Sequence, residues 1–135
     1  MVAPDPTAER QACLQALAGL RRGEAAPMAA WLRAHLARQV LPFWTRHAFD
    51  ARGGLSTCLA DDGRVVSPDK WVWSQWRAVW VFSRLHRHVD PDSAWLERAR
   101  GIIEFCRRDG WDARARGWAL VLDAAGRPVR GAESI

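Results

Sequence analysis

The alternation of apolar and polar positions predicts a series of amphipathic helices. Over residues 27–43, one helix face is traced at steps of three and four by Met28, Trp31, Leu32, His35, Leu36, Gln39, Val40 and Phe43. Pro27 suits the first turn of this helix, and Pro42 is expected to bend or end it near Leu41, because proline has no backbone N–H to donate. An earlier helix is expected over residues 7–22, with Thr7 as its N-cap.

Two glycine-containing segments predict β-hairpins. The first covers residues 54–66, with Asp62-Gly63 at its turn, and the second covers residues 117–129. Residues of the first recur 63 positions later in the second: Gly54, Leu59, Gly63, Arg64 and Val66 match Gly117, Leu122, Gly126, Arg127 and Val129. Two helices are predicted between the hairpins, over residues 69–88 and from Asp90-Pro91 to Gly110. The chain therefore repeats a unit of helix, helix and hairpin, which needs stacked neighbours to bury its apolar faces.

The helix predicted over residues 69–88 is unusually rich in tryptophan. Four of the nine tryptophans lie within residues 70–80. At 3.6 residues per turn, one face collects Lys70, Trp73, Arg77 and Trp80. A helix that is apolar nearly all round is expected to be buried, and an arginine within it needs a partner or a wet cavity. Indole rings can stack on the apolar face of a pyranose while a guanidinium binds its oxygens, so this face is a candidate sugar-binding surface.

This tryptophan-rich segment resembles the N-acylglucosamine 2-epimerase family, which includes the renin-binding protein, mannose isomerases and cellobiose 2-epimerases. The family pattern is a lysine followed by Trp-x-Gln-x-Arg-x-x-Trp, matched here by Lys70, Trp73, Gln75, Arg77 and Trp80. Further matches follow in order: Phe43-Trp44, Asp50, Gly53-Gly54-Leu55, Cys58-Leu59, the turn from Asp62 to Val65, Phe82, Ser83, Leu85, Leu120-Val121-Leu122, the turn from Gly126 to Val129, and Glu133-Ser134-Ile135. The resemblance runs from about Trp31 to Ile135, and the order and spacing of its motifs make it specific.

The resemblance implies an (α/α)6 barrel, with six inner helices, six outer helices and a sugar site at the mouth of the inner ring. The fold class expected for this chain is therefore all-α: a partial (α/α)6 barrel, or toroid of helical hairpins, with short β-hairpins between helix pairs. Family members are several times longer than this chain. We expect residues 27–135 to be the N-terminal third of such a barrel, incomplete at its C-terminus, and residues 1–26 to be an accessory N-terminal helix.

The activity implied by the resemblance is that of an isomerase. A sugar 2-epimerase or aldose–ketose isomerase, of the N-acylglucosamine or N-acylmannosamine type, moves a proton at carbon 2 of the opened sugar, and histidine suits that task. The two histidines that the family implies lie beyond the end of this chain. None of the four histidines present matches them: His35, His47, His86 and His88. We therefore expect the full-length protein to be an enzyme, and this chain alone to have weak or no activity.

The same resemblance assigns roles to residues of the tryptophan-rich helix. It implies that Arg77 is catalytic and binds substrate, because it holds the sugar oxygens and stabilises negative charge as the sugar opens and enolises; the alternative is an ion pair with a structural carboxylate. Trp73 is expected to be the wall of the pocket or part of the core, and Lys70 to bind substrate at the pocket rim or to face solvent. Gln75 lies on a different face and is expected to be structural. Trp76 departs from the family, which usually has a small residue there, so it must find space or shift the helix.

Composition and charge narrow the other functions. With 49% hydrophobic residues the chain is not disordered, and no apolar run reaches the ~18 residues of a membrane span. The N-terminus lacks the regions of a signal peptide, so a cytoplasmic location is expected. The net charge of +5 comes from arginines that alternate with acidic residues along the chain, which does not favour nucleic-acid binding. The expected partner is a small sugar substrate, with no nucleic acid and no membrane, and a homodimer stays open.

Metal and cofactor chemistry is not indicated. The three cysteines form no Cys-x-x-Cys pair, and the spacing of His86 and His88 directs their rings apart on a helix. We expect no metal and no cofactor. The competing hypothesis to an isomerase is a non-enzymatic module that binds sugar or a protein partner through an exposed apolar flank of a partial toroid.

Overall fold

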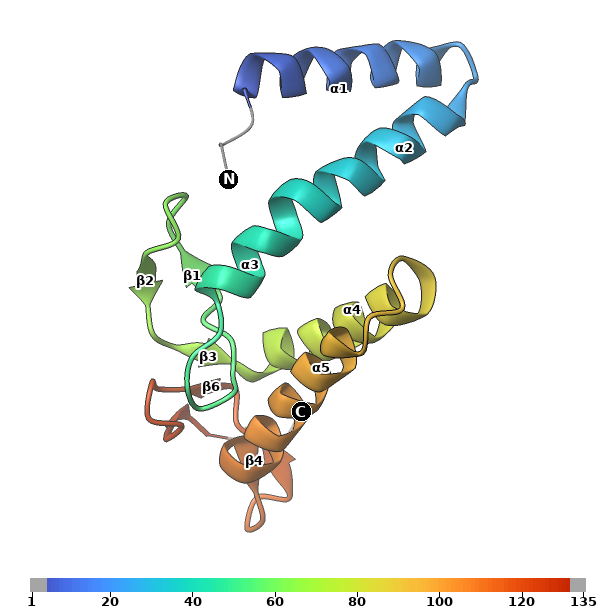
Figure 1. Cartoon of the computed structure of the whole chain (residues 1–135). Coiled ribbons are helices and arrows are strands. Elements are labelled where there is room, and N and C mark those ends of the chain that lie inside the picture. The colour runs from blue at the N-terminus through green and yellow to red at the C-terminus, as the bar shows by residue number, and fades with distance from the viewer. Residues whose placement is uncertain (1–4, 132–135) are drawn as a thin grey trace. The chain divides into compact units, whose positions relative to one another are not determined.

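The computed structural model describes residues 5–131, and within this range the protein is mainly helical with three small antiparallel sheets (Figure 1). Contacts divide the chain into two compact units, Met1–Trp44 and Thr45–Ile135, which are described in turn. The family match at Glu133-Ser134-Ile135 lies outside the described residues. None of the described helices is both long and apolar enough to cross a membrane.

The first unit contains two packed helices, α1 (Pro6–Arg21) and α2 (Ala25–His35). The N-cap of α1 is Asp5, whose carboxylate accepts a hydrogen bond from the backbone N–H of Thr7 at 2.9 Å, so the expectation that Thr7 is the cap is wrong. Asp5 takes this place because Pro6 fits the first helical turn, where its missing N–H costs nothing. The division of the chain after residue 26 stays a prediction.

The second helix does not end at Pro42. After α2 the backbone widens into a π-helical turn, Leu36–Val40, and continues as α3 (Leu41–His47). The N–H of Leu41 donates to the carbonyl of Leu36, five residues earlier. The wide turn comes directly before Pro42, where a regular helix would meet the clash of the proline ring with the preceding turn. The expected end near Leu41 is therefore replaced by a local change of helix type.

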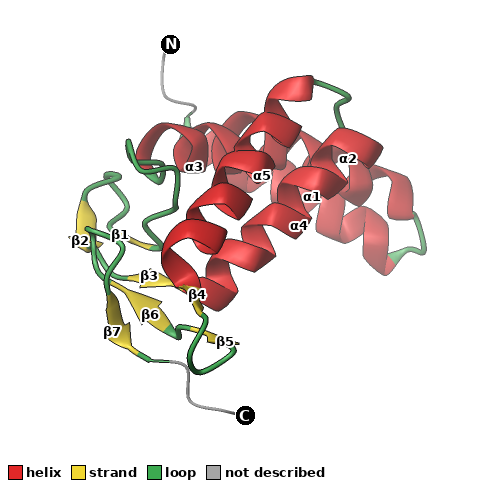
Figure 2. Cartoon of the chain, turned by 90° about the horizontal axis from the view of Figure 1, so that it is seen from below, coloured by secondary structure: helices red, strands yellow, loops and turns green. Residues whose placement is uncertain are grey.

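The second unit is built on α4 (Val72–His88) and α5 (Ser93–Phe105), which lie side by side (Figure 2). A π-helical turn, Cys106–Gly110, follows α5. The cap of α5 is Asp92, whose carboxylate accepts a hydrogen bond from the N–H of Ala94 at 2.9 Å, so the helix begins after the expected start at Asp90-Pro91. The buried apolar side chains of this unit are Ala48, Leu55, Val72, Phe82, Leu85, Ala99, Ile102, Phe105, Cys106, Ala119, Val121 and Leu122.

Both predicted hairpins are present and repeat each other. Their strands are β1 (Cys58–Leu59), β2 (Val65–Ser67), β6 (Val121–Leu122) and β7 (Pro128–Arg130), so every bound of the second hairpin lies 63 residues after its counterpart. Gly63 and Gly126 occupy equivalent turns with φ of 86° and 81°, where a residue with a Cβ would be strained. The helix, helix and hairpin repeat inferred from the sequence is confirmed at this level.

The second hairpin also fixes the start of α4. Its strand β6 pairs with β3 (Lys70–Trp71), the strand that leads into α4, and a separate pair joins β4 (Trp111–Asp112) to β5 (Gly117–Trp118). The strands β3, β4 and β6 lie together where α4 begins and where α5 ends (Figure 2). The helix with the family motif thus begins from a hydrogen-bonded strand, which holds its first turn in place.

Gln75 ties α4 to the loop before the first hairpin. Its side chain is fully buried, and its amide accepts from the N–H of Leu55 at 2.8 Å and donates to the carbonyl of Leu55 at 2.9 Å. Both backbone groups of one buried residue are therefore satisfied by one side chain. This confirms the expectation that Gln75 is structural.

Gln75→Leu is expected to destabilise the protein, because it leaves the buried N–H and carbonyl of Leu55 without these partners. An unsatisfied buried group costs about 1–3 kcal/mol, so we expect a loss of roughly 2–4 kcal/mol in the free energy of unfolding. Urea denaturation followed by circular dichroism measures it. The matched control is Gln15→Leu at an exposed position of α1; equal stabilities of the two variants would contradict the role of Gln75.

Candidate functional site

The family motif of α4 presents an aromatic and cationic face to solvent. The side chains of Trp73 and Trp80 are 52% and 64% exposed, and Arg77 between them is exposed as well. The expectation of a helix buried on all sides is therefore wrong, because only the opposite face of α4 packs in the core. As predicted, Trp73, Arg77 and Trp80 share one face of the helix.

Indole and guanidinium groups alternate along this face. The Arg77 guanidinium carbon lies 4.5 Å from the centroid of the Trp73 ring, and that of Arg84 lies 5.8 Å from the Trp80 ring. Within residues 5–131 no carboxylate forms an ion pair with Arg77, so the structural ion pair considered from the sequence is not found there. A guanidinium that rests on an indole keeps N–H groups free at its edge, and these can donate to ligand oxygens.

Lys70 does not belong to this face. It lies in β3, two residues before α4 begins, and its side chain is 1% exposed. The expectation that it lies at a pocket rim or faces solvent is wrong in both forms. The physical reason is the change of period. Side chains alternate across a strand, so Lys70 points inward and Trp71 outward, whereas a helical period was expected to include both residues.

The buried ammonium of Lys70 forms an ion pair with the carboxylate of Asp50. It also lies 5.5 Å from the centroid of the Phe105 ring. Asp50 stands in the loop after α3, and its other oxygen accepts from the N–H of Arg52 at 2.9 Å. This contact joins three parts of the unit: the loop that enters the first hairpin, the strand that enters α4, and the end of α5.

Trp76 lies beside the β4–β5 pair, where its side chain finds space. Its ring meets Trp118 of β5 edge to face, with centroids 5.0 Å apart, and Trp118 meets Trp111 of β4 in the same way at 5.0 Å. With Arg107, these three rings line an open groove of about 470 Å³. The helix keeps its α form from Val72 to His88, so the bulky side chain does not break it. Trp111 and Trp118 were not candidates from the sequence, because strands of two residues are too short to show a periodic pattern.

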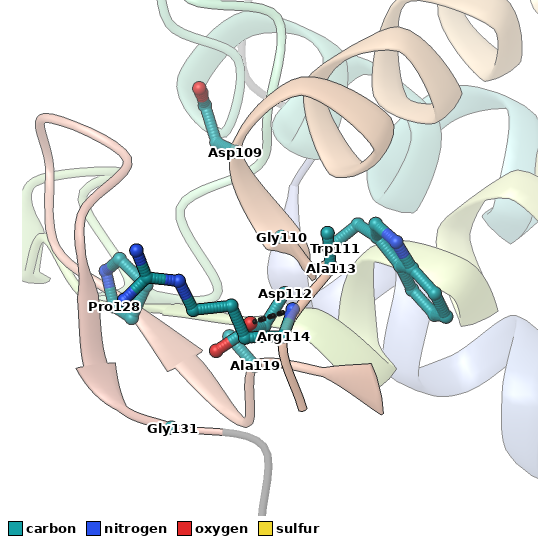
Figure 3. A pocket seen from close by; sticks show the side chains of 9 residues that line it. All are labelled: Asp109, Gly110, Trp111, Asp112, Ala113, Arg114, Ala119, Pro128 and Gly131. Carbon is teal, nitrogen blue, oxygen red and sulfur yellow. Dashed lines mark hydrogen bonds between the residues drawn. The ribbon is translucent and has the colours of Figure 1, made fainter. Parts of the chain in front are cut away.

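A second hollow lies next to the β4–β5 pair (Figure 3). It has a volume of about 360 Å³ and is lined by Asp109, Gly110, Trp111, Asp112, Ala113, Arg114, Ala119, Pro128 and Gly131. Figure 3 shows the Trp111 ring turned away from the Arg114 and Pro128 side chains. Backbone N–H groups of Ala115 and Arg114 donate to Asp112 and lower its pKa. An acid of lowered pKa stays ionised near neutrality and is a weak general base there.

Asp109 links the loop after α3 to the second hairpin. It pairs with Arg108 at 2.7 Å and with Arg52 at 3.2 Å, and a Cβ on Gly126 would collide with its carboxylate. Burial alone would raise the pKa of Asp109, but hydrogen bonds from Arg108 and Arg52, and their charges, outweigh it and the pKa is lowered. Asp109 is therefore a charged structural group.

The other described groups that could act as a nucleophile or a base, Cys106, His35 and His86, are placed as structural groups. Burial, and then the charge of Asp109, raise the pKa of Cys106 to about 12, so this thiol stays protonated and is a poor nucleophile. His35 bonds Glu9 at 3.0 Å, and His86 bonds the carbonyl of Asp92 at 3.0 Å. Within residues 5–131 no three histidine, cysteine or acidic side chains are placed to hold a metal ion.

The sequence of this chain is similar to those of known N-acylglucosamine 2-epimerases. No protein-family model matches the chain. It is 39% identical over 98 residues to the N-acylglucosamine 2-epimerase of Bos taurus, covering 68% of this chain and 23% of that protein. It is 47% identical over 95 residues to the N-acylglucosamine 2-epimerase of Rattus norvegicus, covering 67% and 23%. The chain thus spans less than a quarter of the length of these curated relatives.

The structure of this chain is also similar to parts of solved sugar epimerase and isomerase structures. Cellobiose 2-epimerase from Bacillus thermoamylovorans B4167 matches with a TM-score of 0.64 and 27% identity, over 73% of this chain and 25% of that one. A D-mannose isomerase matches with a TM-score of 0.66 over 76% and 25%, and at 22% identity this likeness shows the fold alone.

Asp50→Ala is expected to destabilise the protein far more than Lys70→Met, because the two partners are buried unequally. Removal of Asp50 leaves a buried ammonium without a counter-charge, which costs about 3–5 kcal/mol. Removal of the ammonium leaves Asp50, which is 37% exposed and can be hydrated, so we expect a change within about 1 kcal/mol. Urea denaturation measures both variants. The double variant should recover most of the Asp50→Ala loss; a Lys70→Met variant as unstable as Asp50→Ala would contradict this account.

Asp109→Asn is expected to flatten the acid dependence of stability. Because the folded-state pKa of Asp109 is lowered, its stabilising effect is full above the unfolded-state pKa of about 3.9 and is lost as pH falls through the folded-state pKa. We expect a loss of about 1 kcal/mol at pH 7 and a smaller difference from the parent protein at pH 3. Urea midpoints at the two pH values test this, with Asp61→Asn, on an exposed turn, as the control. A difference that grows at pH 3 would have the wrong sign.

Proposed function

We propose that this chain, which belongs to the N-acylglucosamine 2-epimerase family, is part of a sugar 2-epimerase or aldose–ketose isomerase. The relatives named N-acylglucosamine 2-epimerase and the structural likeness to a cellobiose 2-epimerase support this class of activity. The observation that carries the proposal is the solvent-facing row of Trp73, Arg77 and Trp80, at the positions of the family motif. The substrate class proposed is a small sugar of the N-acylglucosamine or N-acylmannosamine type.

We further propose that the chain forms part of an (α/α)6 barrel. The 63-residue repeat of helix pair and hairpin supports it, because such units bury their apolar flanks by stacking on further units. In this arrangement the exposed face of α4 turns toward the substrate cavity of the ring. The chain would then be an N-terminal portion of the barrel, in keeping with the share of its relatives that it spans.

Arg77 has the chemistry for one half of the proposed reaction. Proton transfer at carbon 2 of an opened sugar builds negative charge on the neighbouring oxygen, and a fixed guanidinium can stabilise it by several kcal/mol. Trp73 supports the guanidinium from below and offers an apolar surface for the sugar carbons. Arginine does not release its proton in proteins, so the base must be another group. We place the bases outside this chain, because His35 and His86 bond structural partners and no described histidine matches the family positions.

The proposal gives Lys70 a structural role instead of substrate binding. Its buried ion pair with Asp50 supports a role in positioning α4 rather than in touching substrate. A cytoplasmic location and a homodimer both stay predictions.

A non-enzymatic sugar-binding or interaction module is the second candidate. The exposure of two large indoles on one helix face favours it, since exposed aromatic clusters often mark binding surfaces. The two candidates differ in one measurement, which is hydrogen exchange at carbon 2.

Arg77→Met is expected to lower kcat/KM of the complete protein by about 10²–10³-fold, the usual effect of removing one group that stabilises developing negative charge. Proton NMR in heavy water follows loss of the carbon-2 signal of N-acetylmannosamine or mannose. Arg87→Met, at an exposed position of the last turn of α4, is the matched control. Full activity of Arg77→Met would remove Arg77 from the mechanism, and no exchange by the complete parent protein would favour the binding module. The 135-residue chain alone should show no exchange, because its bases lie elsewhere.

A further inference from the structure

We infer that the groove between α4 and the β4–β5 pair is a stacking site for a closed pyranose ring, distinct from the Arg77 face. Its walls are Trp76, Trp111, Trp118 and Arg107. The inference depends on the proposed function only for the class of ligand, a sugar, and concerns residues to which neither the motif nor the mechanism assigns a role.

The three indoles form a continuous aromatic wall that is left open to solvent. Trp118 is central, meeting Trp76 at an interplanar angle of 75° and Trp111 at 67°. Trp111 and Trp118 nevertheless remain 45% and 38% exposed. Burying an aromatic side chain is strongly favourable, so a cluster that packs edge to face and keeps this much ring surface in water is suited to receive a ligand.

The walls are held in place before any ligand binds. Trp111 and Trp118 are partners in the β4–β5 register, and the N–H of Ala119 donates to the carbonyl of Gly110 at 2.8 Å just behind them. The turn between the strands is closed by Asp112, which accepts from two backbone N–H groups. A site whose side chains are already ordered loses little conformational entropy on binding.

The composition of the groove fits a hydroxyl-bearing ring. A pyranose has an apolar C–H face for indoles and a rim of oxygens for a guanidinium, and Arg107 is the one charged group in the lining. The volume of about 470 Å³ lies in the range of ~300–1,000 Å³ that holds small ligands. A stable protein partner needs ~800 Å² and ~20–30 residues on each side, far more than these four residues offer.

The decisive probe is methyl β-D-glucopyranoside, because its blocked anomeric carbon prevents ring opening and so separates stacking from catalysis. Indole N–H signals of the 135-residue chain in ¹H–¹⁵N NMR report binding. We expect the signals of Trp76, Trp111 and Trp118 to move together, and Trp111→Ala and Arg107→Met each to raise Kd about tenfold or more. Arg107 is exposed, so its variant keeps the fold if Trp111→Ala does not.

Trp44→Ala and Arg87→Met are the controls, and both should leave Kd unchanged. A Kd raised by Arg77→Met but not by Arg107→Met or Trp111→Ala would place the sugar on the Arg77 face, which overturns this inference and leaves the proposed function intact. If the three signals do not move at a ligand concentration of about 0.1 M, which is 100-fold above a Kd of about 1 mM, the inference is also overturned. Binding in the groove by a complete protein without carbon-2 exchange would support the groove and overturn the proposed function.

Discussion

The arrangement of the second unit is constrained by one ion pair, in which the buried ammonium of Lys70 meets the partly exposed carboxylate of Asp50. The ammonium of Lys70 is almost completely withdrawn from water, and a buried charge is tolerated only with a partner. Because Asp50 can supply that charge only from the loop that enters the first hairpin, the loop, the strand β3 and the first turn of α4 must come together. The paired hydrogen bonds between Gln75 and Leu55 add a second polar contact one turn further along α4. Apolar packing would allow the helix to rotate or slide, whereas these two directional contacts set which of its faces points to solvent.

The two hairpins show how one repeat of helix, helix and hairpin is joined to the next. Strand β3 follows the first hairpin and pairs with β6, so the second hairpin completes its three-stranded sheet with a strand from the preceding repeat. The turn glycines have a matching reason in both copies: a Cβ on Gly63 would strike the His47 ring, and one on Gly126 would strike Asp109. Each turn is therefore pressed against the end of the helix before it. A chain built in this way extends by adding units rather than by enlarging one core.

Local sequence signals predicted what depends on local geometry. The glycine turns gave both hairpins, and helical spacing put Trp73, Arg77 and Trp80 on one face. The direction of Lys70 was missed because the backbone changes from strand to helix at residues 71–72, and no single period describes both sides of that change. The exposure of the tryptophans was missed for a different reason, because burial depends on which other elements cover a face. The meeting of Trp76 with Trp118, 42 residues apart, likewise depends on how the β4–β5 pair sits beside α4.

The charges around α4 suit this chain to only one part of the proposed chemistry. Its exposed face carries arginines, which stay protonated and can stabilise an enediolate but cannot abstract a proton. The described carboxylates with shifted pKa values, Asp109, Asp112 and Asp123, are all held ionised by N–H donors, so they are weak bases near neutrality. A surface of this kind could bind and polarise the proposed sugar, but its charged groups are poorly suited to take up a proton. Proton transfer at carbon 2 then requires a base brought to the open side of Arg77, which is the side that Trp73 does not cover.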